Sequence, residues 1–101
     1  MDEPERRFYN DLSPQAQDHW VSELRRHPYI AKMTPVTYVA YRYHPVTYLY
    51  CEDDEAIPLE LQKMMVAGSG LDFQTESCTA GHSPFLSQPE TVLGVVNRMT
   101  R

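Results

Sequence analysis

The sequence predicts an α/β fold, and three observations lead to this prediction. The second half of the chain alternates segments in the order strand, helix, strand, helix. Proline, glycine or clustered acids stand at the borders of these segments, where turns are expected. A helical crossover between two strands implies that the strands are parallel neighbours in one sheet. Because a parallel sheet usually has several strands with both faces covered, we expect an incomplete sheet.

The first half of the chain contains one clear helical segment, at residues 13–26. Ser13 is its predicted N-cap, and Pro14 suits the first helical position. A residue that precedes proline disfavours the α conformation, so the proline at position 28 should end this helix.

The middle of the chain leads into the first predicted strand. Residues 28–44 are rich in tyrosine and are predicted to be irregular, with a short extended piece at 36–41. Residues 46–51, VTYLYC, are β-branched and aromatic, which is typical of a strand. Four adjacent acids, at 52–55, then form a loop.

A second helix is predicted to begin at Pro58, and Gly68 and Gly70 are expected to stop it. The side chains expected to face the sheet are Leu61, Met64 and Met65.

A second strand, at residues 72–78, is less apolar than the first. Ser87 and Glu90 have the spacing of a capping box, which predicts the start of a last helix. Its predicted apolar face consists of Val92, Val95, Val96 and Met99.

Composition narrows the class of protein. The chain has 101 residues, enough for one small domain, and a formal net charge of −5. It has no Lys/Arg-rich run, so we expect neither nucleic acid nor a membrane as a partner. No apolar segment approaches the ~20 residues that span a bilayer, and the N-terminus is polar, so we expect a cytoplasmic protein. Cys51 and Cys78 have no metal-ligand spacing and are expected to be buried free thiols.

Two loops at the ends of the predicted strands carry the residues with chemical potential. The acid cluster follows the first strand, and a loop with His82 follows the second. The carboxyl ends of neighbouring parallel strands meet at one edge, which is where open α/β sheets place their sites. A carboxylate paired with an imidazole is the orienting half of a catalytic triad.

These segments resemble the C-terminal part of an α/β-hydrolase. The similarity is to the group that contains plant methyl-ester esterases and hydroxynitrile lyases, with their fungal relatives, and covers nearly the whole chain. It rests on FYNDLSPQAQ, PVTYLYCEDDEAIPLELQ and AGHSPFLSQPETV. The resemblance implies that residues 1–34 are the end of a cap region. Residues 35–101 would then be the last strand–helix–strand–helix of the core.

The resemblance implies that Asp54 is the triad acid and His82 the general base. In such hydrolases the acid often lies four residues before a proline, as Asp54 lies before Pro58, and the histidine commonly follows a glycine, as His82 follows Gly81. The acid also precedes the histidine in this fold. Asp53 stays open as an alternative, since the loop register can slip by one residue. The chemistry implied is hydrolysis of a small-molecule carboxylic ester through an acyl-serine, with no cofactor.

The third member of the triad is not found in the sequence. No G-x-S-x-G nucleophile elbow occurs, and around Ser69 the glycines stand next to the serine rather than two positions away. We therefore expect the chain alone to be inactive and to require an N-terminal half that supplies the serine. Two alternatives stay open. The chain could be a truncated, non-catalytic paralogue that binds a second copy or a partner through an exposed sheet edge, or it could belong to a hydroxynitrile lyase.

Overall fold

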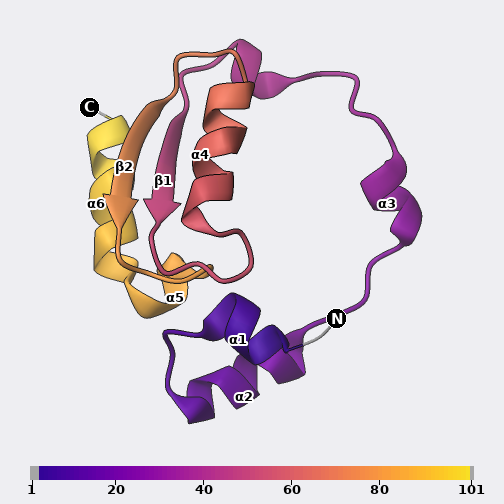
Figure 1. The fold of residues 1–101 in the computed structure, drawn as a ribbon, viewed down its shortest axis with the longest axis vertical. Coiled ribbons are helices and arrows are strands. Elements are labelled where there is room, and N and C mark those ends of the chain that lie inside the picture. Colours follow the sequence, from indigo (N-terminus) through magenta and orange to yellow (C-terminus); the bar gives the residue numbers. More distant parts are fainter. Residues whose placement is uncertain (1–2, 101) are drawn as a thin grey trace.

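The computed structural model describes residues 3–100 and contains a parallel sheet of two strands (Figure 1). Strand β1 (Thr47–Cys51) pairs with β2 (Gln74–Cys78), so that Thr47 lies opposite Gln74 and Cys51 opposite Cys78. The predicted α/β class and the parallel pairing are confirmed. The pairing follows from the helix between the strands, which carries the chain back to the end where β1 began.

Three helices accompany the sheet. Helix α4 (Leu59–Gly68) connects the strands and packs beside β1. A short helix, α5 (Pro84–Ser87), leads into α6 (Pro89–Met99). Helix α6 lies beside β2, where the Arg98 guanidinium donates to the Glu76 carboxylate with Nε 3.1 Å from Oε1 (Figure 1). The predicted stop of α4 is confirmed: Gly70, with φ of 70°, takes the left-handed conformation that glycine allows.

The N-terminal half forms short helical segments and, among the described residues, no strand before β1. They are α1 (Pro4–Tyr9), α2 (Pro14–Glu23), α3 (Tyr29–Met33) and the 3₁₀ turn η1 (Ala40–Arg42), which lies beside the amino ends of the strands. Figure 1 shows α1 and α2 below the carboxyl ends of the strands, whereas α3 lies on an arch far from the sheet. The predicted N-cap is confirmed, because Ser13 Oγ accepts a hydrogen bond from the Ala16 N–H at 3.2 Å.

Two predictions for this half are wrong. The helix predicted to reach residue 26 ends at Glu23, because Leu24 turns to an extended conformation and its N–H closes the last turn on the Val21 carbonyl. Residues 36–41 contain no strand; the segment predicted to be irregular instead holds α3 and η1. The Thr34 hydroxyl donates to the Ile30 carbonyl at 2.6 Å, which closes the end of α3.

The predicted capping box is also wrong. Ser87 ends α5, and α6 begins at Pro89 with Gln88 in the capping position. Proline suits the first helical position because its missing N–H has no intrahelical partner there. This preference shifts the start of α6 by one residue and leaves the Ser87 hydroxyl out of the cap.

The inward face of α4 differs from the prediction. Leu61, Met64 and Met65 are 43%, 67% and 49% exposed, whereas Gln62 is buried. The Gln62 amide turns inward because it bonds to backbone groups at the end of β1, as described below. The polar residue therefore holds the inward position that the sequence assigned to apolar ones.

The buried centre of the sheet lies near the carboxyl ends of the strands. Cys51, Cys78 and Ala80 form it, with Leu49 packed against them. Both cysteines are buried and free, as predicted, and their Sγ atoms lie 3.9 Å apart. Within residues 3–100, every helix is too short or too polar to cross a membrane.

Candidate active site

The loops after the two strands bring Asp54 and His82 together. His82 Nδ1 lies 3.0 Å from Asp54 Oδ2 and 3.2 Å from Oδ1, although the residues are 28 positions apart in sequence. Each loop leaves its strand within a few residues of the paired Cys51 and Cys78. The parallel register therefore places both loops at the same edge of the sheet (Figure 1).

The Asp54 carboxylate is fixed by its own loop. Oδ1 accepts hydrogen bonds from the N–H groups of Ala56, at 2.8 Å, and Ile57, at 2.9 Å. The side chain is 6% exposed, and Oδ2 is directed at His82. These bonds orient the carboxylate before any substrate arrives.

The other three acids of the loop face elsewhere. Glu52, Asp53 and Glu55 are exposed, and the Glu55 carboxylate pairs with Arg6 of α1 at 3.2 Å. Asp53 Oδ2 lies 3.3 Å from the Asn10 amide nitrogen rather than near the histidine. Of these two aspartates, Asp54 is the one whose carboxylate lies within hydrogen-bonding distance of His82.

The pairing sets the proton positions on His82. Because a carboxylate only accepts hydrogen bonds, the contact favours the tautomer of the neutral imidazole that carries its proton on Nδ1 and has its lone pair on Nε2. The His82 side chain is 32% exposed, and the Phe8 ring lies against it with centroids 5.2 Å apart. An imidazole held in this way can accept a proton at Nε2 while the carboxylate stabilises the resulting cation.

Gln62 supports the acid loop from α4, and sequence reasoning missed it. Its Oε1 accepts the Cys51 N–H at 2.9 Å, and its Nε2 donates to the Cys51 carbonyl at 2.9 Å and the Ile57 carbonyl at 2.7 Å. Gln62 thus satisfies the end of β1 as a neighbouring strand would. A glutamine in a helix is usually solvated, so the sequence carried no signal for this role.

Asn10 and Asp11 are two further residues that the sequence did not single out. The Asn10 amide donates to the Asp53 carbonyl at 2.8 Å, and an Asp11 carboxylate oxygen accepts the Gly81 N–H at 2.7 Å. These contacts span 43 and 70 positions of sequence. Only the tertiary structure reveals them.

Cys51, the cysteine nearest the acid loop, has an unreactive thiol. Burial and the neighbouring Cys78 raise the pKa of the Cys51 thiol to about 12. A thiol must lose its proton to act as a nucleophile, so Cys51 is not a candidate for that role. Among residues 3–100, no group of three or more His, Cys, Asp or Glu side chains is arranged to hold a metal ion.

Comparison with known proteins identifies the family. Residues 1–95 match the Alpha/beta hydrolase family. The chain is also 36% identical over 89 residues to "Alpha/beta hydrolase nvfD" from Aspergillus novofumigatus (strain IBT 16806). The aligned part is 88% of this chain and 36% of that fungal protein, so the chain spans about a third of its relative's length. The sheet, the order of acid and histidine, and these matches agree, and the chain belongs to the alpha/beta hydrolase family.

Proposed function

We propose that Asp54 and His82 are the acid and the general base of a serine hydrolase that cleaves carboxylic esters. The observation that carries this proposal is the 3.0 Å contact between Asp54 Oδ2 and His82 Nδ1, in a chain of this family. The geometry leaves Nε2 of His82 for proton transfer, as a triad requires. The resemblance to the methyl-ester esterase group favours a small ester as the substrate.

The proposed reaction has two halves. Nε2 of His82 takes the proton of a serine hydroxyl, whose oxygen attacks the ester carbonyl, while Asp54 stabilises the imidazolium. His82 then gives that proton to the departing alcohol. Water, deprotonated by His82, attacks the acyl-serine and releases the acid and the free serine. Because the 101 residues contain no G-x-S-x-G, the serine is supplied by polypeptide outside them.

A labelling experiment tests this function in the protein expressed from its natural gene, alone and with any polypeptide that copurifies. A fluorophosphonate probe, which reacts with activated serines, should label a serine outside these 101 residues. Hydrolysis of p-nitrophenyl acetate and of a methyl ester should accompany the labelling. Both signals should fall sharply in His82→Ala and persist in the matched control His19→Ala, which alters an exposed histidine of α2.

Two outcomes would contradict the proposal. The absence of both probe labelling and ester turnover in the folded protein would argue against a hydrolase. Cyanide release from a cyanohydrin without ester turnover would assign the base to a lyase reaction instead.

A binding role is the second candidate, and the sheet supports it. The two-stranded sheet leaves one edge of β1 and one edge of β2 without a neighbouring strand among residues 3–100. Unpaired strand edges are templates for pairing with another chain. We propose that a second copy or a partner chain pairs there.

A further inference from the structure

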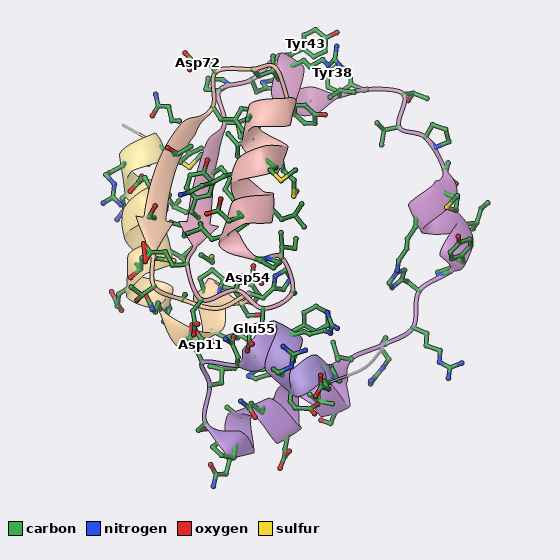
Figure 2. The ribbon with its side chains drawn as sticks, viewed as in Figure 1. Asp11, Tyr38, Tyr43, Asp54, Glu55 and Asp72 are labelled. Carbon is green, nitrogen blue, oxygen red and sulfur yellow. The ribbon has the colours of Figure 1, made fainter. Side chains whose placement is uncertain are left out.

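Asn10 and Asp11 join the N-terminal helices to both loops of the candidate site. They follow directly after α1, which ends at Tyr9. Figure 2 labels Asp11 at the same end of the sheet as Asp54 and Glu55, where the carboxyl ends of the strands lie. The Oδ1 atoms of Asn10 and Asp11 are buried, so both side chains are packed into this junction.

The hydrogen bonds of these two residues form a closed ring. The Asn10 amide donates to the Asp53 carbonyl at 2.8 Å, and the Asp53 N–H donates to the Ala80 carbonyl at 3.0 Å. The Gly81 N–H donates to Asp11 Oδ2 at 2.7 Å, and Asp11 follows Asn10 in the chain. Three segments are thus each bonded to the other two, which fixes their relative positions.

The ring acts on the peptide units that precede the paired side chains. Asp53 stands immediately before Asp54, and Gly81 immediately before His82. The peptide group between Ala80 and Gly81 is held on both sides, with its carbonyl bonded to Asp53 and its N–H to Asp11. A shift of Asp11 therefore moves the backbone from which the imidazole projects.

Close packing reinforces this attachment. A Cβ atom added to Gly81 would lie 2.1 Å from Asn10 Oδ1 and 3.1 Å from Asp11 Oδ1. The side chains of Asn10 and Asp11 therefore occupy the space that a side chain at position 81 would need. Phe8 against the His82 ring and Arg6 on Glu55 add two further contacts from α1 to the same loops.

We propose that Asn10 and Asp11 are positioning residues that set the separation of Asp54 and His82. The inference rests on the proposed function for its effect on catalysis, but its geometric part is independent of any reaction. Asn10 and Asp11 contact backbone groups and the Asp53 carboxylate, and neither is bonded to the imidazole or the Asp54 carboxylate. Catalytic groups need placement within about half an ångström, and supporting hydrogen bonds are the means by which proteins restrict such groups.

Proton NMR of the protein expressed from its natural gene tests the geometric part. The proton on His82 Nδ1, bonded to a carboxylate, should give a low-field resonance that disappears in His82→Gln and Asp54→Asn. We expect Asp11→Ala to remove this resonance while the amide resonances of β1 and β2 persist. The matched control is Asp18→Ala, at an exposed position of α2, which should leave the resonance unchanged.

A graded series separates positioning from folding. Asp11→Asn keeps an oxygen that can accept the Gly81 N–H, so the low-field resonance should be retained in this variant. Asn10→Ala, which removes the bond to Asp53, should weaken the resonance, whereas Asn97→Ala on the exposed part of α6 should not. If Asp11→Ala fails to fold, Asn10→Ala and Asn97→Ala decide the question.

Kinetics test the catalytic part. Ester turnover by Asp11→Ala should show a kcat ~10–100-fold lower with little change in KM, because misplacement of about 1 Å can cost a hundredfold. Asp11→Asn should recover most of the rate. An unchanged low-field resonance and unchanged kcat in folded Asp11→Ala, with both lost in Asp54→Asn, would overturn the positioning role and leave the proposed function intact. A resonance that depends on Asp11 in a protein with no ester turnover would support the geometry and reject the function.

Discussion

The choice between two adjacent aspartates is made by a few hydrogen bonds. Asp54 Oδ1 is held by the N–H groups of Ala56 and Ile57, which turns Oδ2 toward His82. The side chain of Asp53 points to Asn10 instead. The two carboxylates are adjacent in sequence, and the direction in which each side chain points is set by the backbone conformation of the loop. The sequence alone therefore does not distinguish them.

At the same scale, Gln62 should contribute strongly to stability. Gln62→Ala removes the side-chain partner of the Cys51 N–H and of the Ile57 carbonyl. It leaves the Cys51 carbonyl with the Asp54 N–H at 3.3 Å. Buried groups left without partners cost about 1–3 kcal/mol each, so we expect a loss of about 3 kcal/mol in the free energy of unfolding. Urea denaturation measures it, with Gln15→Ala on the exposed side of α2 as the control. Equal midpoints for the two variants would show that the Gln62 bonds are dispensable.

The buried Cys51 thiol predicts a dependence of stability on alkaline pH. Its pKa is raised from 9.0 to about 12 in the folded chain, chiefly by burial. Between these values the folded state keeps a proton that the unfolded state loses, so the free energy of unfolding falls as pH rises. The slope attributable to this group is at most about 1.4 kcal/mol per pH unit. Urea titrations from pH 8 to 10 should show a shallower fall in Cys51→Ala than in the parent chain; identical slopes would contradict the account.

At the scale of elements, the junction between α1 and the histidine loop depends on a glycine. Gly81→Ala would place a methyl group 2.1 Å from Asn10 Oδ1, so the Asn10 side chain, which is bonded to the Asp53 carbonyl, must shift. Overpacking of this kind costs about 1–3 kcal/mol. Gly68→Ala is the matched control, since no atom lies within 4 Å of the added Cβ. Urea unfolding of both variants checks the prediction, and a Gly81→Ala chain as stable as Gly68→Ala would refute the close packing.

The type of an element was predictable from sequence where its composition agreed with the turn-forming residues at its ends. The run of β-branched and aromatic residues from 46 to 51 identifies β1, and the glycines at 68 and 70 identify the end of α4. Positions that depend on competing local bonds were not predictable. Helix α6 begins at Pro89 and not at the capping box predicted from Ser87. On α4 the Gln62 side chain is buried, whereas Met64 and Met65, predicted to face the sheet, are exposed. In each case a specific contact overrides a general preference.

The residues of the candidate site also fall into two groups: those that sequence reasoning singled out and those that it missed. The meeting of the site's two loops could be predicted because parallel strands bring their carboxyl ends to one edge, whereas the choice of Asp54 and His82 within those loops came from the resemblance to α/β-hydrolases. The residues that hold those loops, Asn10, Asp11 and Gln62, are ordinary polar positions in the sequence. Their roles arise from contacts across 43, 70 and 11 positions, which no local pattern encodes.

At the scale of the whole molecule, the chain leaves much of its apolar surface uncovered. Its radius of gyration is 15.2 Å, against about 13 Å for a compact domain of 100 residues. Leu61, Met64 and Met65 are exposed along α4, beside a strand with a free edge. Large exposed apolar patches indicate a surface for association.

We therefore expect the isolated 101-residue chain to self-associate or to unfold without a sharp transition, so urea unfolding is measured on the protein expressed from its natural gene. Sedimentation should show an average mass that rises with concentration. Met64→Glu with Met65→Glu should reduce this effect more than Met33→Glu, which alters an exposed residue on the distant α3. A monomer with a sharp, concentration-independent thermal transition would contradict the expectation.

The most direct test of the central claim compares two neighbouring aspartates in the protein expressed from its natural gene. Asp54→Asn removes the carboxylate that holds the His82 proton, and Asp53→Asn makes the same chemical change one residue away. We predict that Asp54→Asn lowers kcat for ester hydrolysis by ~10⁴-fold, the loss seen when a triad acid is made neutral. Asp53→Asn should stay within a few-fold of the unmodified protein. Equal rates in the two variants would show that the pair formed by Asp54 and His82 does not carry out the chemistry proposed for it.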